Sequence, residues 1–167
     1  GFEVLFEILS TLKADGFDCC LFTPISVQDW PEGVRAYERQ VKQLGLEDNV
    51  VFMGRVPQRQ MGALYEQCDL MVYPSLCESF GFSMIEAMGH SIPIVASDTA
   101  INREMCDGAA LFYPPLDAAA GAKAIRDAFE PAVMEKLREA GRMRVSSFDW
   151  GWQRYAREFV DMLGLVS

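Results

Sequence analysis

The chain has 167 residues, 50% of them hydrophobic and 23% charged, with a formal net charge of −9. This length and apolar content predict one globular domain and exclude an intrinsically disordered chain. The sequence contains no apolar run near the ~18 residues needed to cross a bilayer. The acidic balance argues against nucleic acid as a partner and against attraction to an anionic membrane.

The cysteine and histidine content bears on the compartment and on metals. Five cysteines occur, at positions 19, 20, 68, 77 and 106, and none of them form a C-x-x-C pair. The odd number and this spacing indicate reduced thiols, as in a cytoplasmic protein. His90 is the only histidine, so the sequence has no cluster typical of a zinc site and we expect no bound metal.

Helical and strand-like segments alternate along the chain. Apolar spacing predicts helices over residues 2–14, 32–44, 58–67 and 82–89, a helical turn over 102–106, and helices from 117 onward with breaks near Pro131 and Phe148. Short apolar runs predict strands over residues 17–22, 49–53, 69–73, 92–96 and 109–113. The last helix is expected to bury Trp152, Tyr155, Phe159 and Met162.

This alternation predicts the fold class. Strands that alternate with helices form βαβ units, so we expect an α/β domain over residues 1–167 with a parallel sheet covered by helices on both faces. Ligands bind such sheets at the carboxyl ends of the strands. The positions directly after Met53, Tyr73 and Ala96 are therefore the first candidates for a site.

The segment from Pro74 to Ser97 carries the most chemistry. It turns at Gly81 into a helix, whose first backbone N–H groups can bind a phosphate, with Ser83 adding a hydroxyl. Glu78 and Glu86 are the only two glutamates spaced eight apart, and a carboxylate can accept hydrogen bonds from the adjacent hydroxyls of a ribose or a sugar. Spacing alone leaves another interpretation open, in which Ser79 caps the helix, Glu78 is a first-turn charge and Glu86 is a solvated side chain.

The same segment resembles a known signature. The order E-S-F-G-F-S-M-I-E-A-M, followed by P-I-V-A-S, is similar to the E-x7-E signature of family-4 retaining glycosyltransferases. The surrounding segments N-V-V-F-M-G-R-V, L-Y-E-Q-C-D-L-M-V-Y-P-S and L-F-Y-P-P-L-D agree with it, so the resemblance covers nearly the whole chain. It implies one half of a GT-B fold, the Rossmann-like donor-binding domain.

The resemblance also implies roles for individual residues. Glu86 would hold the ribose hydroxyls of the nucleotide, and Glu78 would act as the catalytic carboxylate beside the donor sugar. The implied donor-binding residues are Ser79, Phe80, Gly81, Phe82, Ser83, Met84 and Ile85 near the diphosphate and sugar, and Gly54, Arg55 and Val56 around the base. Arg103 and Glu104 match a loop nearer the cleft. The substrate would be a nucleotide-diphosphate sugar, with no metal and no other cofactor.

Three departures from the family pattern are visible. The Arg and Lys that grip phosphate would lie before Gly1 and are absent from this chain. The segment L-F-T-P-I-S stands where many members have a glycine-rich turn, and Ser91 stands where a glycine usually precedes x-P. The alternatives that stay open are a GT-B relative with other chemistry, either a nucleotide-sugar epimerase or a phosphorylase, and a degenerate nucleotide-binding module that is not catalytic.

The resemblance also implies that part of the domain is missing. In a Rossmann-like order of 3-2-1-4-5 the first strand is central, and this chain would start after it. We therefore expect the strands near residues 17–23 and 69–73 to flank a gap instead of pairing. The implied partner is an N-terminal acceptor-binding domain of the same polypeptide, through which a cytoplasmic enzyme could contact the cytoplasmic face of a membrane.

Overall fold

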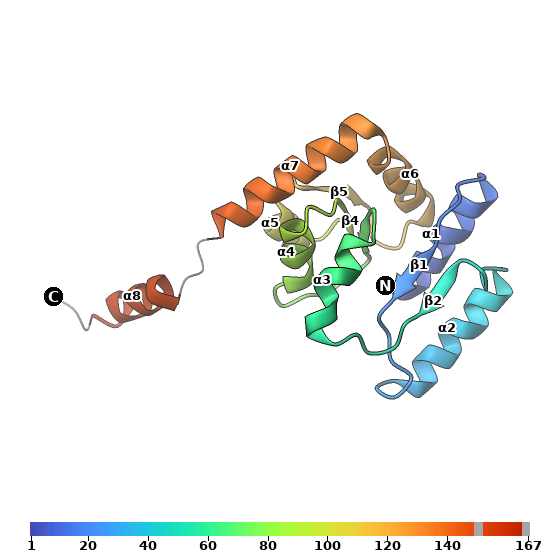
Figure 1. Cartoon of the computed structure of the whole chain (residues 1–167), viewed down its shortest axis with the longest axis horizontal. Coiled ribbons are helices and arrows are strands. Elements are labelled where there is room, and N and C mark those ends of the chain that lie inside the picture. Colours follow the sequence, from blue (N-terminus) through green and yellow to red (C-terminus); the bar gives the residue numbers. More distant parts are fainter. Residues whose placement is uncertain (149–151, 165–167) are drawn as a thin grey trace.

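The computed structural model describes residues 1–148 and 152–164, which form eight helices and five strands (Figure 1). The helices are α1 (Phe2–Ala14), α2 (Pro31–Gln43), α3 (Gln58–Glu66), α4 (Phe82–Gly89), α5 (Ala100–Cys106), α6 (Ala118–Ala128), α7 (Pro131–Ser147) and α8 (Trp152–Met162). The strands are β1 (Leu21–Thr23), β2 (Val50–Phe52), β3 (Met71–Tyr73), β4 (Ile94–Ser97) and β5 (Ala110–Tyr113).

All strand pairs are parallel, as predicted, but they form two separate sheets in the described residues. β1 pairs with β2, and β3, β4 and β5 form a second sheet with β4 in the middle. β1 and β3 do not pair with each other, so the sheet is interrupted between them, where we expected a gap.

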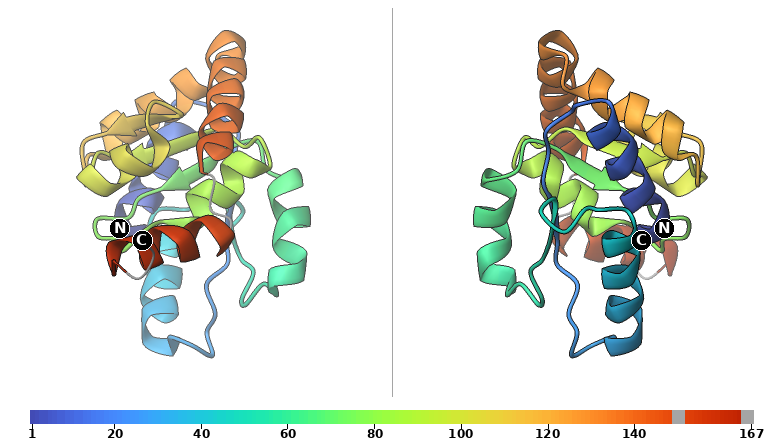
Figure 2. Two further views of the ribbon diagram at one scale, coloured as in Figure 1. Left: turned by 90° about the vertical axis from the view of Figure 1, so that its left-hand side faces the viewer. Right: turned by 90° about the vertical axis from the view of Figure 1, so that its right-hand side faces the viewer.

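Helices cover both faces of the three-stranded sheet, which confirms the predicted fold class. Side chains alternate along β4, so that Ile94 and Ala96 pack under α4 and α5 while Val95 packs under α1 and α6. All three side chains are fully buried. Figure 2 shows α1 and α6 together on one side of the strands and α3 on the other. A strand buried on both faces is mainly apolar, which explains the apolar run from Ile94 to Ala96.

Helix α1 packs against both sheets. One of its faces, which includes Ile8 and Leu12, packs against β5 and α6. Another face, which includes Phe6 and Leu9, packs against α2 and β2. Gly121 of α6 allows the close approach of α1, because a Cβ atom there would lie 2.5 Å from Cδ1 of Ile8.

Two expectations about elements need correction. The first strand is short and begins at Leu21, so Cys19 and Cys20 precede it. The last helix does form, but its described apolar side chains are not buried: Tyr155, Phe159 and Met162 are 60%, 46% and 75% exposed. The side chain of Trp152 lies outside the described residues. Figure 1 shows α8 projecting from the body of the molecule, so the residues described here provide no surface to bury that face. Within the same ranges, no helix combines the length and the apolar character needed to span a bilayer.

Candidate functional site

The start of α4 exposes backbone donors at the carboxyl edge of the sheet. Gly81 precedes the helix with φ +86°, a left-handed conformation, and a Cβ atom at this position would lie 2.4 Å from Cε of Met84. No side chain caps this helix end. The N–H of Met84 already donates to the carbonyl of Gly81 at 3.0 Å, so the outward donors of the first turn are those of Phe82 and Ser83.

Glu78 lies in the loop between β3 and α4, where a neighbouring hydroxyl holds its carboxylate. The hydroxyl of Ser75 donates to Oε1 of Glu78 at 2.6 Å. The side chain of Tyr73 lies near both Glu78 and Ser83. Burial, and then the nearby Glu78 carboxylate, raise the pKa of Tyr73 to about 12, so this phenol stays protonated well above neutral pH. The first glutamate of the pair is therefore hydrogen-bonded to its surroundings rather than freely solvated.

A buried polar network fixes this loop against the next strand. Ser97, at the end of β4, donates to the carbonyl of Ser75. Asn102 of α5 donates to the carbonyl and the hydroxyl of Ser97 at 2.9 Å and 3.1 Å. Both Ser97 and Asn102 are fully buried. The sequence marked the end of this strand as a candidate position but did not predict that Ser97 and Asn102 would anchor the loop that carries Glu78.

Glu86 lies one turn into α4 and faces α3. The amide of Gln58 donates to its Oε1 at 3.2 Å, and the hydroxyl of Tyr65 donates to its Oε2 at 3.2 Å. The ring of His90 stacks on the ring of Tyr65, with centroids 5.4 Å apart. Burial, and then the nearby Glu86 carboxylate, raise the pKa of Tyr65 to about 12. The alternative in which Glu86 is only a solvated helix residue does not describe this arrangement.

The segment Gly54–Val56 lies between β2 and α3, the helix that contacts Glu86. It follows β2 and leads through Pro57 into α3, whose first residue, Gln58, contacts Glu86. Gly54 has φ +72° and forms the turn out of the strand. The guanidinium of Arg55 pairs with Asp29 at 2.6 Å and is largely exposed. The cation of Arg55 is therefore paired with Asp29.

The remaining predicted residues contribute less through their side chains. Phe80 and Phe82 pack ring to ring at 4.4 Å, and together with Ile85 they line a small hollow that faces α7. Ser79 is exposed. Arg103 lies on α5, where it forms an ion pair with Asp98 and lowers the pKa of that carboxyl group. In residues 1–148 and 152–164, no three His, Cys, Asp or Glu side chains gather as metal ligands.

The structure thus arranges the two glutamates as the ends of one polar edge. Glu78 lies in the loop after β3, Ser83 lies in the first turn of α4, and Glu86 lies beside α3. The free N–H groups at the start of α4 stand between the two glutamates in the chain. Tyr65 and Gln58 were not predicted from the sequence, because they are 21 and 28 residues from Glu86. Only the three-dimensional arrangement of α3 and α4 reveals these contacts.

Comparison with known proteins identifies the family of the chain. The model of the family described as "Glycosyl transferases group 1" matches residues 30–144, which is more than half of the chain. The chain belongs to this family. The expectation of a GT-B type, family-4-like domain is confirmed, and residues 54–56 and 78–86 fall within the matched region of this group 1 glycosyl transferase.

Related proteins show how much of such an enzyme the chain represents. It is 39% identical over 123 residues to the mannosylfructose-phosphate synthase of Agrobacterium fabrum, a match that covers 70% of this chain and 27% of that protein. The structure resembles sucrose-phosphate synthase from Thermosynechococcus elongatus, with a TM-score of 0.77, 27% identity, and coverage of 96% of this chain and 41% of the other. It also shares its fold with Anabaena HepE in complex with UDP and glucose, with a TM-score of 0.78, 21% identity, and coverage of 99% and 45%. The group 1 chain therefore spans about a quarter to a half of the length of these relatives.

Proposed function

We propose that this chain is the donor-nucleotide-binding domain of a retaining glycosyltransferase, which transfers a sugar from a nucleotide-diphosphate sugar to an acceptor. Family membership supports the class of reaction. The observation that carries the proposal is the polar edge formed by Glu86, the first turn of α4 and Glu78. A ribose diol, a diphosphate and a sugar follow one another in such a donor and need these same kinds of groups in this order.

Each group would have a separate task. Glu86 would accept hydrogen bonds from the ribose hydroxyls, because Tyr65 and Gln58 hold its two oxygens in place while each oxygen keeps a further lone pair. The backbone N–H groups of Phe82 and Ser83, together with the positive end of the helix, would stabilise charge on the departing diphosphate. Gly54, Arg55 and Val56 would contact the base through their backbone.

Glu78 would lie beside the donor sugar near the reacting carbon. The bond between the anomeric carbon and the diphosphate oxygen breaks, and the acceptor oxygen bonds to the same face of the sugar. The proton of the acceptor hydroxyl passes to the departing diphosphate oxygen. The hydroxyl of Ser75 holds one oxygen of the Glu78 carboxylate, so the carboxylate could interact with charge on the sugar with little reorganisation. The proposal assigns no step to a metal or to a further cofactor.

The rest of the enzyme also belongs to the proposal. An acceptor-binding domain of the same polypeptide would form the second wall of the cleft, as the much greater length of the relatives supports. The five cysteines are all free thiols, which supports a reducing, cytoplasmic setting. Contact with the cytoplasmic face of a membrane would come through the acceptor-binding domain.

A second candidate function is a nucleotide-binding module without catalysis. One observation favours it: residues 74–97, which carry both glutamates, contain no lysine or arginine to grip a phosphate. Such a module would bind nucleotide through the same groups but more weakly, and it would transfer no sugar.

Calorimetry with UDP, GDP and ADP, each with and without an attached sugar, tests the proposal on the 167-residue chain. Binding of at least one of them supports a nucleotide site. We expect Glu86→Ala to weaken binding by about 1.5–3 kcal/mol, because Glu86 contacts the nucleotide itself. The loss in Glu78→Ala should be smaller. Glu139→Ala on the exposed part of α7 is the matched control and should leave binding unchanged.

Three outcomes would contradict particular parts of the proposed function. Equal losses in the two variants, or a larger loss for Glu78→Ala, would contradict the assignment of the two glutamates. Absence of binding at millimolar nucleotide would remove the donor site itself. Sugar transfer should require the acceptor-binding domain. Sustained transfer by the 167-residue chain alone would contradict that requirement, and it would also exclude a module without catalysis.

A further inference from the structure

The loop between β3 and α4 begins where the ladder between β3 and β4 ends. The last paired residues are Tyr73 and Ala96, and Pro74 follows directly. Proline has no backbone N–H, so it cannot donate a further ladder bond. From this point side chains hold the loop, because the hydroxyl of Ser97 donates to the carbonyl oxygen of Ser75.

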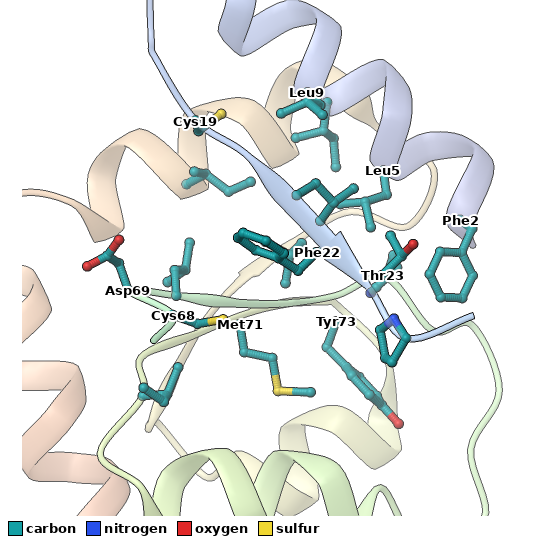
Figure 3. A pocket seen from close by; sticks show the side chains of 18 of the residues that line it. Phe2, Leu5, Leu9, Cys19, Phe22, Thr23, Cys68, Asp69, Met71 and Tyr73 are labelled. Carbon is teal, nitrogen blue, oxygen red and sulfur yellow. The ribbon is translucent and has the colours of Figure 1, made fainter. Parts of the chain in front are cut away.

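On its other side the loop borders a cavity. This cavity of about 970 Å³ lies beside β3, and Ser75, Cys77 and Glu78 are among the residues that line it. Figure 3 shows the cavity next to Met71 and Tyr73, the first and last residues of β3. The hydrogen bonds that reach the carbonyl of Ser75 come from the opposite side, from β4 and α5.

Asn102 supports Ser97 from α5. Its side-chain amide donates to the carbonyl oxygen of Ser97 at 2.9 Å and to the hydroxyl oxygen of Ser97 at 3.1 Å. The backbone N–H of Asn102 donates to the hydroxyl of Thr99, which caps α5. Ser97 and Asn102 are both 0% exposed. Water cannot compete for bonds in such a place, so the two side chains form a rigid support.

Ser75 connects this support to the carboxylate of Glu78. Its carbonyl oxygen accepts from the buried pair, and its hydroxyl donates to Oε1 of Glu78. Both groups belong to one residue of a short loop. The position of the Ser75 carbonyl therefore determines where its hydroxyl lies, and with it one oxygen of Glu78.

Glu86 has a support of its own. Gln58 and Tyr65 of α3 donate to its two oxygens, each at 3.2 Å. The support from α3 and the support from β4 and α5 have no residue in common. Groups that share no partner respond to substitutions independently, so a change in one support should leave the other in place.

We propose that Ser97 and Asn102 are positioning residues for Glu78, and that they set the affinity for the donor sugar separately from the affinity for the nucleotide. This inference rests on the proposed function, in which Glu78 lies beside the sugar and Glu86 holds the ribose. Both positioning residues are fully buried, so they act through Ser75 and not by contact with the donor.

The experiment measures the sugar advantage, defined as the Kd of a nucleoside diphosphate divided by the Kd of its sugar derivative. Calorimetry on the 167-residue chain compares UDP-glucose with UDP, GDP-mannose with GDP, and ADP-glucose with ADP. Ser97→Ala should reduce the sugar advantage about threefold, because the hydrogen bonds of Glu78 lose their alignment. The Kd of the nucleoside diphosphate should not change. In a Glu78→Ala background, Ser97→Ala should cause no further reduction.

The order of the loop gives a second measurement that needs no nucleotide. NMR order parameters of the Leu76, Cys77 and Glu78 amides should fall in Ser97→Ala from the rigid range of about 0.85 toward about 0.6. Ser75→Ala keeps the carbonyl of residue 75 but removes the hydroxyl that holds Glu78. It should reduce the sugar advantage by a similar factor while the loop stays ordered.

Ile125→Val is the matched control for a general loss of stability. Ile125 lies on α6 in the core against α1 and β5, and this substitution opens a small cavity there without touching the support of the loop. The sugar advantage and the order parameters of the loop should both stay as they are in the parent chain.

Several results would overturn the proposal. An equal loss of affinity for the nucleoside diphosphate and its sugar derivative in Ser97→Ala would show a general structural effect. A further loss in the Glu78→Ala background would show that Ser97 acts by another route, and unchanged order parameters would show that it does not hold the loop. If Ser97→Ala does not fold, an undiminished sugar advantage in Ser75→Ala counts against the proposal.

Failure of the proposed function has a different signature. A parent chain that binds none of the six nucleotides would contradict the donor site, and the positioning role would fall with it. A parent chain that binds a nucleoside diphosphate but gains nothing from the attached sugar would keep the nucleotide site and overturn only the role of Ser97 and Asn102.

Discussion

Ser91 holds a backbone conformation that suits glycine. Helix α4 ends in a Schellman motif, in which the N–H of Ile92 donates to the carbonyl of Ala87 at 2.9 Å and the N–H of Ser91 donates to the carbonyl of Met88 at 3.0 Å. Ser91, at the left-handed position of this motif, has φ +58°. The family resemblance places a glycine at this position. The departure seen in the sequence therefore has a structural cost.

Ser91→Gly should stabilise the chain. A left-handed conformation costs an L-residue about 1–2 kcal/mol, and the greater entropy of glycine in the unfolded chain offsets part of that gain. We expect a net increase in the free energy of unfolding of about 0.5–1 kcal/mol, measured by urea denaturation. Ser91→Ala keeps the strained conformation and is the control. An equal gain in both variants would show that the serine hydroxyl, not the backbone, is the cause.

In the proposed donor site, Tyr65 would position Glu86. Its hydroxyl holds one carboxylate oxygen while Gln58 holds the other, so the carboxylate is oriented before a ligand arrives. Tyr65→Phe should weaken binding of a ribonucleotide about fivefold, because one hydrogen bond to a charged group is lost. Binding of the matching 2′,3′-dideoxynucleotide should not change, since that ligand has no hydroxyls for Glu86.

A second tyrosine–glutamate pair provides the control for this prediction. The hydroxyl of Tyr37 contacts Oε1 of Glu3 at 3.4 Å, and both residues belong to the α1–α2 region rather than to the site. Tyr37→Phe should leave both ligands bound as before. A loss of affinity for the dideoxynucleotide in Tyr65→Phe would mean that the tyrosine shapes the whole pocket instead of orienting one carboxylate.

At the scale of elements, the contact between α1 and α6 depends on a small residue. Gly121 lies against Ile8, and an added Cβ atom would also come within 3.3 Å of the Tyr113 ring. Gly121→Val should lower the free energy of unfolding by about 1–3 kcal/mol, because extra methyl groups overpack a filled core. Thermal unfolding measures this loss.

A compensating substitution tests the cause of that loss. Ile8→Ala removes the atoms nearest to the new side chain, so the double variant should be more stable than the sum of the single changes predicts. Additive losses would show that Gly121→Val acts on the helix itself, through the low helix propensity of valine, and not through the contact with α1.

The sequence predicted the elements well where local pattern determines them. Helices such as α1 carry an apolar stripe whose spacing is visible without any structure, and the run from Ile94 to Ala96 in β4 is apolar because it is buried on both faces. The pattern of α8 also predicted a helix, but burial of its apolar face was wrong. Periodicity identifies an apolar face, while the element that covers it lies elsewhere in the chain or outside it.

The candidate site was predictable to a similar extent. Glu78 and Glu86 could be selected from their spacing and from the resemblance, because both lie in one continuous segment. The residues that hold them could not be selected in this way, since Tyr65 contacts Glu86 from α3 and Asn102 contacts the loop of Glu78 from α5. A rule based on strand ends marks the edge of the sheet, but the contacts across that edge depend on how α3 and α5 pack.

At the scale of the whole molecule, buried phenols couple folding to alkaline pH. Burial raises the pKa values of Tyr65, Tyr73 and Tyr113 from the ordinary 10 to about 12. The folded chain therefore holds these protons more tightly than the unfolded chain does. This contribution to stability is complete below pH 10 and is lost as the pH rises toward 12.

Tyr113 allows this coupling to be measured separately from hydrogen bonding. Its side chain is 1% exposed, and its hydroxyl has no hydrogen-bond partner among the described residues. Tyr113→Phe therefore removes a titrating group without removing a hydrogen bond, and stability at pH 7 should stay the same or rise slightly. Near pH 11 the variant should lose less stability than the parent chain. The full difference approaches about 2–3 kcal/mol at higher pH, since one pKa unit corresponds to about 1.4 kcal/mol.

Urea denaturation followed by circular dichroism at pH 7, 9, 10 and 11 measures both effects. Tyr155→Phe is the matched control, because it removes a phenol that is 60% exposed on α8. Its alkaline loss of stability should follow that of the parent chain. If Tyr113→Phe also follows the parent between pH 10 and 11, ionisation of Tyr113 does not contribute to alkaline unfolding. The α1–α6–β5 core would then tolerate a phenolate.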